Sequence, residues 1–419
     1  MAKPTLEGLP AELLLIVLSQ VSDWESLRSI VHASPTCHSV YLIVRSELLC
    51  GILKRQYGAL LDLPEAILAI RSKGLFFFEN KEKVIALLDT WRRREEIKRL
   101  SSMSATRLDE PDSLEETIDL LWLHKELQFF LKDYSTNVPR PSWIDPAQWN
   151  HELPIQMSHA EQRRFMRALC RLYTHANIFG QPEKHPYDGC ELRINTFDDE
   201  EAYRIFFGTM PPWEYEEMGC VWSYLRLKYD PVYKEITDTL SALIQSAKSS
   251  KRECFWFRDV IPKDQYPPNW SVLVDCVDCL EEIPDYTDGL ASIGPGFLYR
   301  VLHAKPLVRR NMVMANLDSF PCDTFIGLGL GISWDERLPL TDPADRHDVP
   351  DFEHYWSNLP PLEQPNLGWK RLGLVPHTPD QTLQEALEYF HNREREAEWL
   401  WGYALWDAER LKAWKAPQV

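Results

Sequence analysis

The stretch that decides the fold runs from Leu9 to Tyr41 and reads LPAELLLIVLSQVSDWESLRSIVHASPTCHSVY. Pro10 and Glu12 stand where a helix would begin, since proline is preorganised for the first turn and an acidic side chain there interacts favourably with the helix dipole. Ser22-Asp23 and Ser34-Pro35 have the residue types of two further helix starts. The stretch therefore predicts three consecutive short helices.

Each of these predicted helices carries an apolar face. The faces are formed by Leu13, Leu14, Val17, Leu18 and Val21 in the first helix, Leu27, Ile30 and Val31 in the second, and Val40, Tyr41, Val44 and Leu48 in the third. A unit of about 45 residues buries too little of its surface to hide this much apolar area within itself. Part of it is therefore expected to contact a partner or the rest of the chain.

The remainder of the chain is also dominated by helical periodicity. Ser158 and Glu161 have capping-box spacing, and apolar residues then recur every three or four positions until Gly180. Asp230 and Pro231 begin another such helix, and similar stripes occur at 82–99, 114–132, 212–228, 268–283 and 380–413. Alternation typical of strands is confined to Glu191 to Phe197 and Phe325 to Ile332. The prediction is a mainly α fold, with an N-terminal three-helix module packed on a large irregular helical domain.

Breaks in the periodicity suggest the domain boundaries. We expect a module over residues 1–50, a helical C-terminal domain over 51–419, and a flexible loop at about 101–113, where the sequence is small and polar. The proline-rich stretch 338–379 is expected to lie over the surface, because proline fixes φ and removes a backbone donor.

Composition and charge exclude several classes of protein. The 419 residues are 44% hydrophobic and 26% charged, which is typical of a folded chain. The net charge of −17 divides into +2 for residues 1–100, with 14 basic and 12 acidic side chains, and −19 for the rest. Such an acidic surface argues against binding nucleic acid through its phosphates and would favour basic partners at low salt. No stretch approaches the ~20 consecutive apolar residues of a membrane span.

Cysteine usage indicates the compartment. The nine cysteines are odd in number and scattered through a large chain, which fits reduced thiols in the cytoplasm or nucleus better than a disulfide framework. Cys276 and Cys279 have zinc-ligand spacing, but no second suitable pair follows, so buried free thiols are the preferred interpretation. No metal or cofactor is predicted.

Other motifs that suggest chemistry have simpler structural explanations. The glycines of 327–331 lack the spacing and βαβ context of a dinucleotide loop, and the acidic run 198–201 is typical of a helix N-terminus. The basic clusters 92–94 and 309–310 are expected to be solvated or paired with acidic side chains. Most of the tryptophans beyond residue 200 are expected in the core, with a minority in a recognition groove. No constellation predicts catalysis.

The Leu9 to Tyr41 stretch resembles the F-box family, whose pattern is Leu-Pro-x-Glu-Leu, an apolar run, a short acidic turn, Leu-x-x-hydrophobic and a third helix. Beyond it, the segments at 163–180, 211–214 and 401–407 look like those of F-box-like proteins of filamentous fungi. The resemblance implies docking to a Skp-type adaptor, which bridges to a cullin–RING ubiquitin ligase. The positions that match the adaptor-facing ones are Leu9, Pro10, Leu13, Leu27, Val31 and Leu48.

These observations favour a non-catalytic, substrate-recruiting subunit of a Skp–cullin–F-box ubiquitin ligase, whose protein substrate the sequence does not name. Two alternatives remain open. One is a structural or interaction protein whose F-box-like helices are absorbed into its own core. The other is an enzyme or small-molecule binder with an aromatic-lined pocket in the helical domain.

Overall fold

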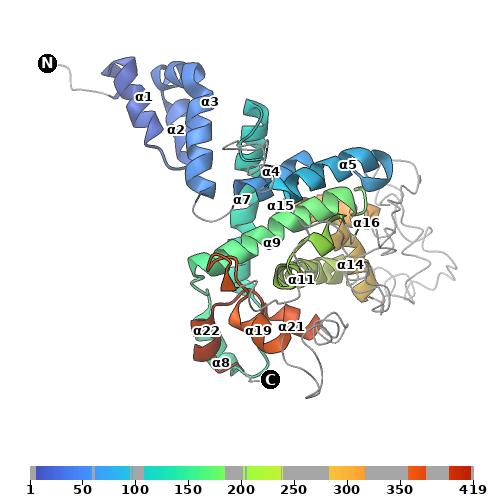
Figure 1. The fold of residues 1–419 in the computed structure, drawn as a ribbon. Helices are drawn as coiled ribbons and strands as arrows, with labels where there is room; N and C mark the ends of the chain where they lie inside the picture. Colours follow the sequence, from blue (N-terminus) through green and yellow to red (C-terminus); the bar gives the residue numbers. More distant parts are fainter. Residues whose placement is uncertain are drawn as a thin grey trace, which may run out of the picture.

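The computed structural model describes residues 6–58, 62–94, 97, 108–184, 202, 205–236, 238, 283–316, 357–373 and 396–416. Within these ranges all regular secondary structure is helical, which confirms the mainly α prediction (Figure 1). The two predicted strands, the stripe at 268–283 except its last residue, and most of the proline-rich segment lie outside the described residues.

The N-terminal module contains the three predicted helices, preceded by one short turn of 3-10 helix. Its elements are η1 (Leu6–Gly8), α1 (Ala11–Ser19), α2 (Trp24–Ala33) and α3 (Pro35–Tyr57). The side chain of Asp23 accepts a hydrogen bond from Ser26 N at 2.8 Å, and Ser34 caps α3 by accepting from Cys37 N at 3.3 Å. These local hydrogen bonds satisfy N–H groups that have no partner within the helix, so both starts fall where the sequence placed them.

The third helix continues through residue 50, where the sequence suggested a boundary, and ends at Tyr57. Its C-terminal half packs against α7 (Leu114–Asn137), and the Tyr57 hydroxyl donates to Leu120 O at 2.6 Å. α3 is also the one helix of the described ranges that is long and apolar enough to cross a membrane by length and composition. A core helix meets the same criterion, so the absence of a membrane partner stays a prediction.

The larger part of the described chain surrounds one central helix, α9 (His159–Ile178), drawn in green in the middle of Figure 1. The capping box predicted from Ser158 and Glu161 is present at its start. The other helices are α4 (Leu63–Arg71), α5 (Phe77–Arg92), α7, α8 (Pro146–Glu152), α11 (Pro212–Leu227), α14 (Ile283–Ser292), α15 (Pro295–His303), α16 (Pro306–Ala315), α19 (Leu367–Gly373), α21 (Glu396–Leu400) and α22 (Ala408–Ala413), with a 3-10 turn η2 (Phe207–Thr209). α4, α7, α11 and α15 all contact α9.

The C-terminal segment differs from the continuous helical stripe expected over 380–413. In its described part, α21 and α22 are separated by turns at 401–406. Gly402 has φ of +77°, a left-handed conformation that glycine adopts without a steric penalty and that ends a helix. The break lets Trp399, Trp401 and Trp406 all enter the core. Together with Trp213, Trp222, Trp369 and Trp414, these confirm the expectation that most tryptophans are core residues.

The loop expected at about 101–113 is described only over its last six residues. There Leu108 is buried, and Asp112 Oδ2 lies 3.0 Å from Arg71 Nη2. Ser113 caps α7 by accepting from Glu116 N at 3.1 Å. Residues 108–113 are therefore anchored to the helical domain, and residues 101–107 lie outside the described ranges.

Candidate docking surface and charged cavity

One face of α1 exposes large apolar side chains. Leu13 and Ile16 are 47% and 54% exposed, and Val17 lies beside them one helical turn after Leu13. Leu14 and Leu18 point to the opposite side and are 1% exposed each. The helix is thus apolar on both sides, and only one of them is covered by the rest of the described chain.

The exposed surface begins before α1 and has a counterpart in α3. Leu9 and Pro10 are exposed immediately before α1, which packs against α3. In α3, Leu42 and Ile43 are also exposed, Ile43 by 81%, next to a kink where Val44 leaves helical geometry. We call Leu9, Pro10, Leu13, Ile16 and Val17 the α1 face. Exposed apolar surface of this kind marks interaction sites in many proteins.

Three of the residues matched to adaptor-facing positions lie in the interior of the module. Leu27 is fully buried, Val31 and Leu48 are nearly so, and all three belong to the hydrophobic core. They cannot form a docking surface in this conformation, and their assignment is corrected to core positions. Among the six, Leu9, Pro10 and Leu13 remain accessible.

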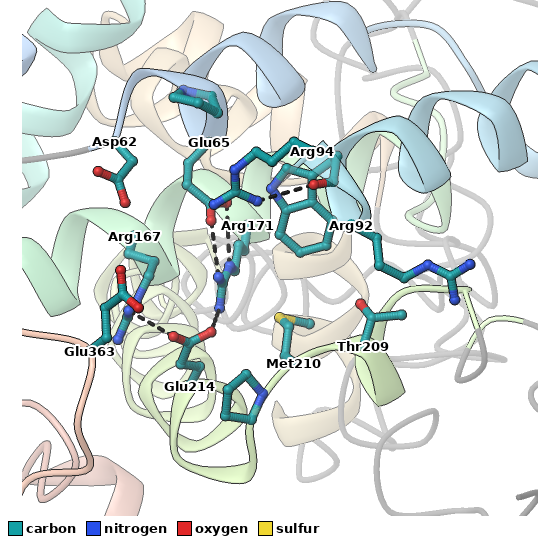
Figure 2. A pocket seen from close by; sticks show the side chains of 13 residues that line it. Asp62, Glu65, Arg92, Arg94, Arg167, Arg171, Thr209, Met210, Glu214 and Glu363 are labelled. Carbon is teal, nitrogen blue, oxygen red and sulfur yellow. Dashed lines mark hydrogen bonds and ion pairs between the residues drawn. The ribbon is translucent and has the colours of Figure 1, made fainter. Parts of the chain in front are cut away.

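A second feature is a cavity of about 420 Å³ in the helical domain, lined mainly by charged side chains (Figure 2). Its walls come from α4, α5, α9 and α11. The charged lining residues are Asp62, Glu65, Arg92, Arg94, Arg167, Arg171, Glu214 and Glu363. The positive and negative charges among them are equal in number.

The charges in its wall form a buried network. Arg171 Nη2 lies 2.9 Å from Glu65 Oε1, and its Nη1 lies 2.6 Å from Glu214 Oε2. Arg167 pairs with the same Glu214 at 2.7 Å and with Glu217 at 2.7 Å. Figure 2 shows the guanidinium of Arg171 between the carboxylates of Glu65 and Glu214. One carboxylate thus bridges two arginines, and α4, α9 and α11 are joined by charge-assisted hydrogen bonds.

Helical spacing explains why these arginines act together. Arg163, Arg167 and Arg171 recur every four residues, which places them on one face of α9. Arg163 pairs with Asp62 at 2.7 Å and so continues the row. The pattern was visible in the sequence, but the carboxylates that pair with it come from other helices far along the chain, so no local signal identified the network.

The network also shifts the pKa values of its members. Burial disfavours the charged form of Arg171, but Glu214 and Glu65 outweigh burial and raise its pKa above the usual value. Burial raises the pKa of the Glu217 carboxyl, against the opposing effect of Arg167. Arg171 also lies over the Trp91 ring, 5.5 Å from its centroid, where a cation–π contact adds to its stabilisation.

Within the cavity wall, Arg167 and Arg171 are paired with the carboxylates of Glu65 and Glu214. Thr209 supplies the one hydroxyl among its described lining residues, which include neither histidine nor cysteine. Elsewhere in the described ranges, no group of three or more potential metal ligands comes together, and Cys37, Cys50, Cys170 and Cys220 are free thiols. Cys276, Cys279, the acidic run and the glycine run lie outside those ranges.

One arginine of each basic cluster pairs with an acidic side chain, in agreement with the expectation for these clusters. Arg92 Nη2 lies 2.7 Å from Asp89 Oδ1, and Arg309 Nη2 lies 2.8 Å from Glu235 Oε2.

Comparisons with known proteins give no relative. No protein-family model, no curated protein and no solved structure matches this chain. Function must therefore be inferred from the structure and from the sequence.

Proposed function

We propose that this protein is a non-catalytic, substrate-recruiting subunit of a Skp–cullin–F-box ubiquitin ligase. The α1 face would dock onto a Skp-type adaptor, which would connect the chain to a cullin–RING ligase. The helical domain, with the −19 charge of residues 101–419, would select the protein to be ubiquitinated and would favour a basic substrate.

The exposure of the α1 face carries this proposal. Leu9 and Leu13 match positions at which an F-box contacts its adaptor, and they are 36% and 47% exposed. In Figure 1 the module stands at one end of the structure, away from α11, α19 and α22, so a partner could approach it. If the module were absorbed into the core of its own chain, these leucines would be buried.

Binding of the purified full-length chain to a Skp-type adaptor tests the proposal. We expect a complex, and we expect Leu13→Asp to weaken it at least about tenfold, because the introduced carboxylate would have to be desolvated at the interface. The variant should melt at the temperature of the wild type, since Leu13 is exposed.

Leu15→Asp is the matched control. Leu15 is exposed on the same helix but points away from the α1 face, because two residues turn an α-helix by about 200°. It should bind the adaptor like the wild type. Absence of a complex, or equal affinity of Leu13→Asp and the wild type, would overturn the proposal.

A further inference from the structure

A second cavity, of about 310 Å³, lies where α7, α9 and α15 meet. It shares no lining residue with the charged cavity. Its polar lining includes Lys73, Asp119, Glu126, Gln181, Arg300 and the backbone at Gly296. Its volume is at the lower end of the range for small-molecule sites.

Two backbone donors at the start of α15 have no acceptor among the described residues. Pro295 has no N–H, and the N–H groups of Gly296 and Phe297 have no hydrogen-bond partner among the described residues. The helix also lacks a side-chain cap, because its N-cap residue is Gly294. Such a helix start carries partial positive charge and free N–H groups, which together favour an anionic group.

The side chain of Gln181 is a second, independent sign of a missing partner. Gln181 is only 7% exposed and lines the same cavity, yet its amide makes no hydrogen bond with any described residue. The amide atoms are not among the fully buried, unpaired side-chain atoms of the described residues, so they reach the solvent-accessible space of the cavity. The amide is therefore available for hydrogen bonding to an occupant of the cavity.

A carboxylate and a guanidinium converge on the same point. A Cβ atom placed on Gly296 would lie 3.9 Å from Arg300 Nη1, 3.9 Å from Glu126 Oε2 and 3.3 Å from the Tyr173 ring. Glu126 accepts a hydrogen bond from the Tyr173 hydroxyl, Arg300 pairs with Glu183, and Asp119 makes no ion pair or hydrogen bond with a described residue. Donors for an anion and carboxylates for a cation therefore line one small space.

We propose that this cavity binds a small zwitterionic molecule of the amino-acid class. Its carboxylate accepts from the N–H groups of Gly296 and Phe297, and its ammonium group faces Glu126. A simple anion would lie close to the Glu126 carboxylate, and a simple cation would leave the two N–H groups unpaired. A zwitterion satisfies both sides at once. This site is separate from the α1 face, so the inference does not depend on adaptor docking.

Titration of the full-length chain with each of the twenty L-amino acids tests the proposal, by calorimetry and by thermal shift. We expect saturable binding of at least one. The matched probes are the N-acetylated form of that amino acid, its decarboxylated amine and inorganic phosphate. Each should bind at least about tenfold more weakly, since each lacks a charge-assisted hydrogen bond. No binding at millimolar concentration, or equal binding of any of these probes, would overturn it.

Two variants locate the site. Glu126→Gln removes the charge but keeps an acceptor for Tyr173, and Gly296→Ala places a methyl group between the converging groups; each should weaken binding about tenfold or more. Gly51→Ala in α3 is the control. Its Cβ would make only an ordinary contact, 3.6 Å from Arg55 Nη1, and Gly51 does not line the cavity. If Gly296→Ala does not fold, Glu126→Gln decides. If Glu126→Gln bound the amino acid with wild-type affinity, the proposal would be wrong.

Discussion

The guanidinium of Arg171 on α9 and the carboxylate of Glu65 on α4 meet in the interior, 106 residues apart in sequence, with Nη2 2.9 Å from Oε1. Both side chains are almost fully buried. Because Arg171 also holds Glu214, a single residue joins α4, α9 and α11.

Replacing Arg171 by methionine should strongly destabilise the protein. The variant keeps most of the side-chain volume but leaves Glu65 without its arginine and removes one of the two arginines around Glu214. Breaking a buried pair in this way costs about 3–5 kcal/mol of unfolding free energy. Urea denaturation followed by circular dichroism measures the loss.

Lys54→Met is the control for that experiment. Lys54 pairs with Glu110 at 3.0 Å, but both side chains are more than half exposed. An exposed pair is worth about 0–1 kcal/mol, so this variant should unfold close to the wild type. Similar losses in the two variants would show that burial of the Arg171 network has no special energetic weight.

Gly219→Ala should loosen the contact between α11 and α21. A Cβ atom at this position would lie 2.2 Å from the ring of Trp399, which is itself buried. Overpacking of this kind costs about 1–3 kcal/mol. Thermal unfolding should show a lower melting temperature. Gly51→Ala should instead stabilise by about 0.5–1 kcal/mol, since α3 has room for the methyl group and alanine favours helix. If Gly219→Ala melted at the wild-type temperature, the close packing of α11 against α21 would be contradicted.

Acidification should destabilise the protein through two buried histidines. Burial lowers the pKa of His175 from 6.5 to about 3 and that of His124 to about 4. The unfolded chain therefore binds protons at these sites below pH 6.5, while the folded chain does not until the lower values are reached. As the pH falls below 6.5, each histidine lowers the free energy of unfolding by about 1.4 kcal/mol per pH unit, until its folded-state pKa is reached.

His175→Phe tests this origin of the pH dependence. The His175 ring lies among Phe179, Phe206 and Phe207, so phenylalanine suits the site chemically. Between pH 6.5 and 5, the wild type should lose roughly 2 kcal/mol more unfolding free energy than the variant. If chemical denaturation gave the wild type and His175→Phe the same change in unfolding free energy with pH, His175 would not be the origin of the pH dependence.

Asn366→Asp should detach the C-terminal segment from the domain. The Asn366 amide donates to Tyr403 O at 2.7 Å and to Trp406 O at 2.9 Å in a buried position. A carboxylate of the same shape cannot donate to these carbonyl oxygens, so we expect a loss of at least about 2 kcal/mol. Hydrogen exchange at 401–406 should accelerate. The exposed Asn137→Asp serves as control, and equal exchange in both variants would contradict the prediction.

Much of the helical structure could be predicted because its determinants are local. The caps at Asp23, Ser34 and Ser158 bond within three residues of themselves, and the apolar stripes repeat within two turns. The expected helix over 380–413 failed in its described part because Gly402 adopts a left-handed conformation there. A stripe of apolar residues does not reveal such a break.

The sequence by itself therefore determined the mainly α character, several helices including the three of the N-terminal module, and the resemblance to an F-box, since these depend on neighbours along the chain. Only the tertiary structure decided that Leu13 faces outward while Leu14 and Leu27 are buried, because both sides of α1 are apolar and long-range packing selects which is covered. The pairing of Arg171 with Glu65 and the convergence of Gln181, Glu126 and Gly296 on one cavity likewise depend on contacts between distant segments. Local periodicity contains no information about such contacts.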